Sequence, residues 1–154
     1  MVKKFLSVCE SIDEFNIIAP IYDSKMADTF LRNKLRLDKM DREYVIALHL
    51  DLRKNLIGYE VVAIGSSSKA IVEPALVYKS AILNNAAGIV LAHNHPSGSP
   101  RPSKEDQELT ERLTNAGEIL GIKFLDHLVI GRDRYYSFTD QEVRRKSSVC
   151  DRKN

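Results

Sequence analysis

The chain has 154 residues, enough for one domain with a substantial core, and its 44% hydrophobic and 29% charged residues are ordinary for a globular protein. A formal net charge of +2 is too small to indicate a nucleic-acid-binding protein, and no apolar stretch approaches the roughly 20 residues that span a bilayer. The N-terminus lacks the long apolar region of a signal peptide, and Cys9 and Cys150 lie at opposite ends, so we expect a cytoplasmic protein without membrane association or a disulfide framework.

The first half of the chain predicts a helix followed by a β-hairpin. Asp23 is suited to begin a helix over 24–35. The charged stretch 38–42 separates this helix from the apolar run 44–50, which predicts a buried strand. A charged turn then leads to a second predicted strand over 58–64, so that the two strands form the hairpin.

The second half of the chain predicts helices that alternate with strands. A proline in the first position fits a helix over 74–85. We expect the buried face of this helix to consist of Leu76, Val77, Ala81 and Ile82. The small apolar run 87–92 predicts a central strand that is covered on both faces. An amphipathic helix over 104–120 and strands over 122–130 and 134–138 complete an α/β pattern.

Two histidines, a serine and an aspartate follow the central strand at fixed offsets. They are His93, His95, Ser103 and Asp106, which read H-x-H, seven residues, then S-x-x-D. Since residues two apart on a strand point to the same side, we expect His93 and His95 to converge while Asn94 faces away. Two imidazoles and a carboxylate are three zinc ligands with the fourth position open, which is typical of catalytic sites. The spacing therefore predicts a zinc site at His93, His95 and Asp106.

Each part of this pattern also has an ordinary structural interpretation. Ser103 followed by Asp106 is a good N-terminal cap for the helix over 104–120, with negative charge in the first turn, where it is favourable. Taken alone, His93 and His95 are explained equally well as core or surface histidines. The joint pattern of a small-residue strand, both histidines and the polar pair at fixed offsets favours the metal site.

The extended motif is similar to that of a known superfamily. The residues from His93 to Asp106 resemble the motif of the JAB/MPN metallopeptidase-like (JAMM) superfamily. The opening string HNHPSG, with further segments at 125–131 and 135–138, resembles its bacterial branch, the RadC-like proteins. The likeness runs over about 24–138. It implies a cytidine-deaminase-like JAB/MPN α/β fold, in which a curved mixed sheet is flanked by helices.

The resemblance also suggests how the chain is divided. We expect an N-terminal segment over 1–23, a RadC-like JAB/MPN domain over 24–140 and a basic C-terminal tail over 141–154. Full-length RadC proteins carry an N-terminal helix-hairpin-helix DNA-binding region, and this chain looks like a short form without it. The tail is predicted to be solvated, and a contact with a phosphate backbone is the alternative.

The resemblance implies roles for two more residues. In the superfamily a glutamate upstream of the histidines is the general base, and Glu43 matches that position, whereas Glu60 and Glu73 remain alternatives. Zinc would bring the pKa of a bound water to about 7. Glu43 would then accept its proton and pass it to the departing amine, while Ser103 would donate a hydrogen bond to the developing oxyanion.

A further histidine lies in the predicted strand over 122–130. His127 is surrounded in sequence by apolar residues, and Asp126 precedes it. His127 is interpreted either as a satisfied core histidine or as a residue that orients a zinc ligand.

We therefore expect a zinc-dependent hydrolase of the JAMM type, a metallopeptidase or isopeptidase that cleaves an amide bond in a peptide or protein substrate. One alternative is a DNA-repair-associated or mobile-element accessory protein that binds DNA or a protein partner, for which the basic tail is the physical support. Another is a zinc-bearing interaction module without turnover. The sequence specifies neither the substrate nor the oligomeric state.

Overall fold

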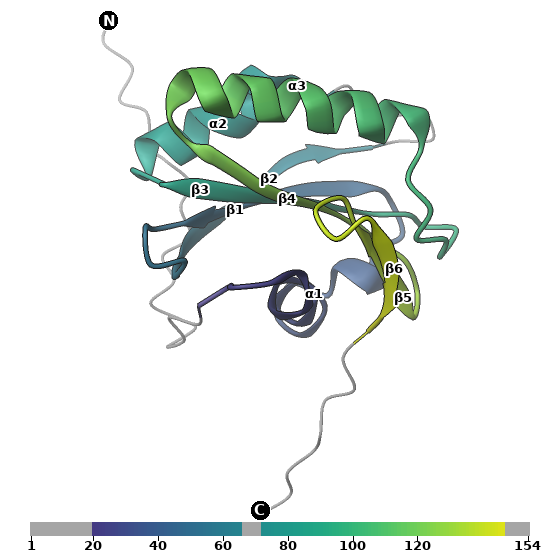
Figure 1. The fold of residues 1–154 in the computed structure, drawn as a ribbon. Helices are drawn as coiled ribbons and strands as arrows, with labels where there is room; N and C mark the ends of the chain where they lie inside the picture. The colour runs from purple at the N-terminus through teal and green to yellow at the C-terminus, as the bar shows by residue number, and fades with distance from the viewer. Residues whose placement is uncertain (1–19, 66–71, 147–154) are drawn as a thin grey trace, which may run out of the picture.

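A computed structural model of the protein describes residues 20–65 and 72–146 (Figure 1). Its centre is a six-stranded mixed sheet with the strand order β2-β1-β3-β4-β5-β6. The strands are β1 (Tyr44–Leu50), β2 (Leu56–Ile64), β3 (Gly88–Asn94), β4 (Lys123–Ile130), β5 (Arg134–Ser137) and β6 (Glu142–Arg145). Strands β3 and β4 run parallel, and the other neighbours pair antiparallel.

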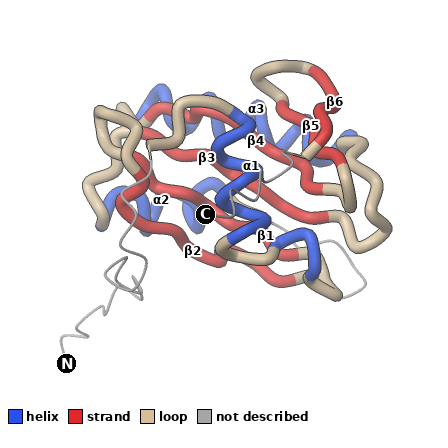
Figure 2. The backbone as a smooth tube through the Cα atoms, turned by 90° about the horizontal axis from the view of Figure 1, so that it is seen from below, coloured by secondary structure: helices blue, strands red, loops and turns tan. Residues whose placement is uncertain are grey.

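Helices cover both faces of this sheet. Helix α1 (Ser24–Asn33) lies across one face, and α2 (Pro74–Leu83) and α3 (Lys104–Leu120) lie on the other (Figures 1 and 2). A short 3-10 turn, η2 (Leu37–Lys39), follows α1. The predicted α/β class, with a mixed sheet flanked by helices, is confirmed. Among the described residues, no helix combines the length and the apolar character needed to cross a membrane.

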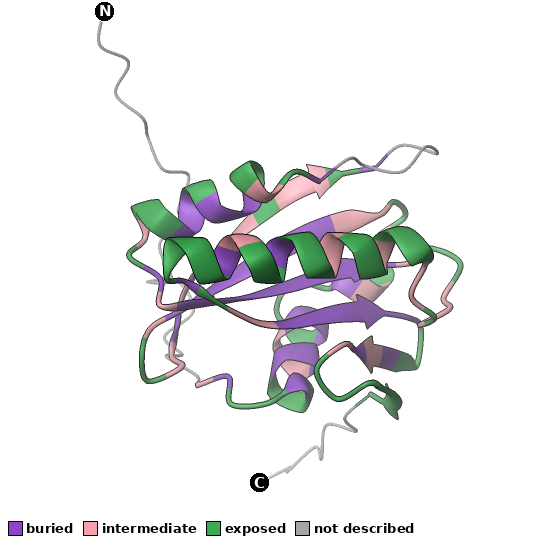
Figure 3. Ribbon diagram, turned by 45° about the horizontal axis from the view of Figure 1, so that its top comes forward, coloured by how far each residue is buried: buried purple, intermediate pink, exposed green. Residues whose placement is uncertain are grey.

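The alternation of side chains along the strands divides the interior into two hydrophobic cores. On β1, Ile46 and Leu48 belong to the core beneath α1, whereas Val45 and Ala47 belong to the core beneath α2 and α3. Strand β3 is buried over its whole length, as predicted for a central strand. Figure 3 shows these buried strands between helices whose outer faces are exposed. The same alternation sends neighbouring residues at the end of β3 toward opposite helical layers.

The buried face of α2 differs from the prediction. Two of the four residues expected to face inward are 43% and 50% exposed, namely Leu76 and Ile82. Tyr78 and Ser80 are buried instead, because each finds a polar partner inside. The Tyr78 hydroxyl donates to the Leu113 carbonyl oxygen at 2.7 Å, and Ser80 Oγ lies 3.2 Å from His49 Nε2. Such partners lie on other elements, so the apolar pattern of the helix alone cannot reveal them.

The described structure continues on both sides of the residues 24–140 that the sequence analysis assigns to the domain. Strand β6, assigned to the basic tail from the sequence, pairs antiparallel with β5. All four of its side chains are exposed, so it lacks the alternation of apolar and polar residues that predicts a strand. At the other end, Ile21 is buried and its N–H donates to the Lys54 carbonyl oxygen at 2.8 Å.

Candidate metal centre

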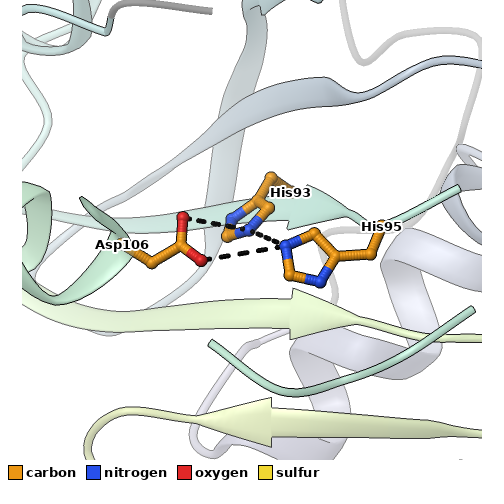
Figure 4. Close-up of side chains that lie close together, drawn as sticks. All are labelled: His93, His95 and Asp106. Atoms are coloured by element: carbon orange, nitrogen blue, oxygen red, sulfur yellow. Dashed lines mark hydrogen bonds and ion pairs between the residues drawn. The ribbon is translucent and has the colours of Figure 1, made fainter. Parts of the chain in front are cut away.

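Three side chains with metal-binding atoms converge where β3 ends and α3 begins (Figure 4). His93 lies near the end of β3, His95 directly follows the strand, and Asp106 lies in the first turn of α3. The two Nε2 atoms of His93 and His95 are 3.0 Å apart. The Asp106 carboxylate oxygens lie 3.3 Å from His93 Nε2 and 3.7 Å from His95 Nε2. All three side chains therefore face a common point.

The spacing of these atoms suits a bound metal ion. In a tetrahedral site with bonds of about 2.0–2.1 Å, the ligand atoms are roughly 3.3 Å from one another. The two imidazole Nε2 atoms, at 3.0 Å, and His93 Nε2 with Asp106 Oδ1, at 3.3 Å, lie close to that value, and one ligand atom from each of the three residues lies within 4.8 Å of the others. Two imidazole nitrogens and one carboxylate oxygen also form a donor set common among catalytic metal sites. The residues present therefore fit a metal ion, which His93, His95 and Asp106 would hold.

The N-terminal cap of α3 fixes the Asp106 carboxylate. The Ser103 N–H donates to Asp106 Oδ2 at 2.7 Å, and the Asp106 N–H donates to Ser103 Oγ at 3.1 Å. Burial raises the pKa of Asp106, but the neighbouring His93 and the hydrogen bonds with Ser103 lower it by a larger amount, so the pKa lies well below its ordinary value. The carboxylate is therefore ionised at neutral pH.

The hydroxyl of Ser103 keeps one hydrogen free of the cap. Its oxygen accepts from the Asp106 N–H, and a hydroxyl that accepts in this way still carries a hydrogen that it can donate. Ser103 lines the same cavity as the three metal-binding side chains. Its roles as a helix cap and as a hydrogen-bond donor to a substrate are therefore compatible.

A cavity of about 350 Å³ brings together all five site residues predicted from the sequence. These residues are Glu43, His93, His95, Ser103 and Asp106. Its remaining wall combines apolar side chains with charged side chains of α3: Val45, Val72, Leu109, Glu105, Glu108 and Arg112. The metal-binding atoms are thus accessible from a space large enough for part of a substrate.

Strand pairing explains how Glu43 reaches this cavity. Strand β1 is antiparallel to β3, with Val45 opposite His93. Continuing that register by two residues places Glu43 opposite His95. A carboxylate just before β1 and an imidazole just after β3 are therefore brought to the same end of these two strands. Burial and the nearby His93 lower the pKa of His95, and the negative charges of Asp106 and, to a smaller extent, Glu43 oppose this.

Asn94, which the sequence analysis expected to face away from the metal site, holds the backbone on both sides of Glu43. Its Oδ1 accepts from the Tyr44 N–H at 2.8 Å, and its Nδ2 donates to the Arg42 carbonyl oxygen at 2.8 Å. The Asn94 side chain points away from the candidate metal ligands, as expected, but it also holds the backbone beside Glu43 through its two hydrogen bonds. The signal available in the sequence was an asparagine just after the predicted central strand, since a buried amide requires hydrogen-bond partners.

The two competing glutamates lie outside the lining of this cavity. Glu73 is the N-cap residue of α2, and its Oε2 lies 2.6 Å from Arg112 Nη2. Glu60 lies on β2 opposite Ala47, where its charge acts on the buried His49. Of the three glutamates considered, Glu43 is the one that the described structure places with the metal-binding residues.

His127 contacts the candidate ligand His93. Its Nε2 lies 2.9 Å from His93 Nδ1, and its Nδ1 lies 2.7 Å from Thr110 Oγ1. The ring is fully buried and stacks on Phe138, with 4.9 Å between ring centroids. Burial lowers the pKa of His127 well below its ordinary value, so the ring is neutral. The contact favours the interpretation of His127 as a residue that orients a ligand.

Asp126 forms hydrogen bonds within the sheet and not with the candidate metal ligands. Its Oδ2 accepts from the Ser137 hydroxyl at 2.6 Å, and its Oδ1 accepts from the N–H groups of Thr139 at 3.0 Å and His127 at 2.7 Å. These bonds join the middle of β4 to the end of β5. Burial raises the pKa of Asp126, although the hydrogen bonds oppose this.

Comparison with known proteins identifies a common family for most of the chain. The sequence profile of the RadC-like JAB domain family matches residues 21–143. The UPF0758 protein of Thermotoga maritima is 44% identical over 102 residues, which cover 66% of this chain and 46% of that protein. The UPF0758 protein of Methanococcoides burtonii is 47% identical over 103 residues, or 67% and 45% of the two chains. That of Trichlorobacter lovleyi is 40% identical over 131 residues, or 85% and 54%.

The chain therefore spans about half the length of the curated relatives that it matches. The shared name of these relatives states no activity. The matched region contains all three residues of the candidate metal centre and the cavity beside them.

Proposed function

Since the chain belongs to the RadC-like JAB domain family, we propose that it is a zinc-dependent hydrolase that cleaves an amide or isopeptide bond in a peptide or protein. One observation carries this proposal. His93, His95 and Asp106 face a common point at the wall of an open cavity, and Glu43 and Ser103 line the same cavity. A base and a hydrogen-bond donor beside an accessible three-ligand site are the parts that metal-assisted hydrolysis requires.

In the proposed reaction the metal acts as a Lewis acid, and two side chains act as the general base and as a hydrogen-bond donor. Zinc bound by two imidazoles and a carboxylate supplies a Lewis acid, which brings the pKa of water to about 7. The Glu43 carboxylate accepts a proton from the attacking water and returns it to the departing amine. The Ser103 hydroxyl donates to the carbonyl oxygen as that oxygen becomes negative, and loss of such a donor slows other hydrolases by about 10²–10³.

The described part of the basic C-terminal stretch gives little support to DNA binding. Arg144 Nη2 lies 2.6 Å from Glu142 Oε1, and Lys146 Nζ lies 2.6 Å from Asp133 Oδ1. These exposed pairs place carboxylates beside two of the three cations in the described part of this stretch, and affinity for DNA depends on contacts between such cations and phosphates. We therefore favour a peptide or protein over DNA as the partner.

Metal content separates the proposed ligands from the proposed base. We expect zinc, measured by mass spectrometry of the purified protein, to be lost in His93→Ala and Asp106→Ala and retained in Glu43→Ala. The reason is that the first two changes remove ligand atoms, whereas the third removes only the proton acceptor. Full zinc content after both ligand changes would end the proposal.

Hydrolysis is then tested without knowledge of the substrate. The zinc-loaded protein is incubated with a proteome-derived mixture of peptides and folded proteins, and newly formed amino groups are identified by mass spectrometry. New amino groups are expected with the wild type and not with Glu43→Ala, which keeps the metal. A wild-type protein that binds zinc but produces no new amino groups, from peptides or from folded proteins, would favour an interaction module over a hydrolase.

A further inference from the structure

The hydrogen bonds around Thr110 fix the direction of its hydroxyl group. Thr110 Oγ1 lies 2.7 Å from the carbonyl oxygen of Asp106, one helical turn earlier, and a carbonyl oxygen can only accept. The single hydroxyl hydrogen is therefore directed to Asp106. Toward the ring of His127, whose Nδ1 is 2.7 Å away, the Thr110 oxygen can only accept. His127 must then carry its hydrogen on Nδ1.

The protonation of His127 determines that of His93. The two partners of the His127 ring nitrogens in the described structure, Thr110 and His93, are not anions, so the fully buried ring is neutral. With hydrogen on Nδ1, its Nε2 has a lone pair that accepts from His93 Nδ1 at 2.9 Å. His93 Nε2 is left with a free lone pair, and this is the atom that faces His95 and Asp106.

We propose that Thr110 and His127 are positioning residues for the metal site. They set the tautomer and the orientation of His93, so that its lone pair points at the metal position before the ion arrives. The chain of hydrogen bonds begins at a histidine on β3, passes through β4 and ends on the backbone of Asp106 in α3. It therefore ties the strand that carries two ligands to the helix that carries the third.

The helix offers a matched pair of threonines for the test. Thr114 Oγ1 donates to the Thr110 carbonyl oxygen at 2.9 Å, which repeats the bond of Thr110 to Asp106 one turn later, but Thr114 is exposed. Thr110→Val and Thr114→Val thus remove the same group from the same helix, and only Thr110→Val breaks the chain to His93. Thr110→Ser restores the hydroxyl, and His127→Phe keeps a ring stacked on Phe138 while it removes both nitrogens.

The measured quantity is the dissociation constant for zinc alone, obtained by competition with a chromophoric chelator. We expect Thr110→Val and His127→Phe to weaken zinc binding by about 10–100-fold, whereas Thr110→Ser and Thr114→Val bind as the wild type does. The visible spectrum of the cobalt-substituted protein should change in the two weakened variants and not in the two controls. Thermal unfolding in EDTA shows that each variant is folded before metal is added.

The outcomes distinguish this inference from the proposed function on whose metal site it rests. Zinc binding by Thr110→Val that equals the wild type overturns the inference alone. Equal weakening in Thr110→Ser and Thr110→Val also overturns it, because the hydroxyl would then not be the active group. A wild-type protein that binds no zinc overturns the proposed function together with the inference.

Discussion

Acidification should destabilise the fold through His49, which is buried between β1 and α2. The ring is fully buried, with Nδ1 2.8 Å from Asn84 Nδ2 and Nε2 3.2 Å from Ser80 Oγ. Both partners are uncharged. Burial lowers the pKa of His49 from 6.5 to about 4, although the negative charge of Glu60 opposes this. The folded protein therefore keeps His49 neutral at pH values where the unfolded chain protonates it.

The size of the effect follows from this difference in proton binding. Between about pH 6.5 and pH 4 the unfolded chain binds a proton at His49 that the folded protein does not, so the free energy of unfolding falls as the pH falls. The shift, from 6.5 to about 4, amounts to about 3 kcal/mol at about 1.36 kcal/mol per pH unit. The neutral His49 makes its full contribution to the free energy of unfolding above pH 6.5, and about 2 kcal/mol of that contribution is lost between pH 7 and pH 4.5.

Urea unfolding followed by circular dichroism at pH 7 and pH 4.5 measures this loss, with EDTA present to remove metal. His49→Gln is the matched variant, because its amide can hydrogen-bond and does not titrate. We expect the variant to be less stable than the wild type at pH 7 and to lose about 2 kcal/mol less on acidification. The other buried histidines are common to both proteins. The same loss in both proteins would refute the reasoning.

Three further predictions concern the site and the packing around it. Asn94→Leu leaves the Tyr44 N–H and the Arg42 carbonyl without their partner, so urea unfolding should show that the free energy of unfolding falls by about 1–3 kcal/mol. The variant should retain its zinc but release amino groups more slowly than the wild type. An unchanged rate of release would exclude a link from Asn94 to Glu43. Gly117→Ala would place a Cβ 2.5 Å from both the Ile122 carbonyl oxygen and the Tyr78 hydroxyl. Thermal unfolding should show a loss of about 1–3 kcal/mol, and an unchanged midpoint would contradict the tight contacts of α3 with Ile122 and with Tyr78 of α2. Zinc at 100 times its dissociation constant should stabilise the wild type by about 2.7 kcal/mol and leave Asp106→Ala unchanged in calorimetry; equal stabilisation of both would indicate binding elsewhere.

The parts of the site that depend on local geometry could be predicted from the sequence. His93 and His95 are two residues apart on a strand and so share a side, and Asp106 follows a serine that caps a helix. Glu43 is different, because it reaches the cavity only through the pairing of β1 with β3, about 50 residues apart in sequence. Spacing could not identify that contact, and the family resemblance supplied it. Thr110 had no distinguishing signal, since its partner lies on β4.

In the sequence, a role of Asp106 in capping helix α3 and a role as a metal ligand are competing interpretations. In the structure, the first turn of that helix accommodates both roles. Oδ2 is held by the Ser103 N–H at 2.7 Å, which leaves Oδ1 at 3.3 Å from His93 Nε2. The cap therefore fixes the rotamer of the carboxylate before any metal binds, as the hydrogen bonds of Thr110 and His127 fix the ring of His93. Ordering these side chains during folding reduces the entropy that metal binding would otherwise lose. A helix cap and a candidate metal ligand are thus compatible roles for one carboxylate, because each oxygen of Asp106 serves a different partner.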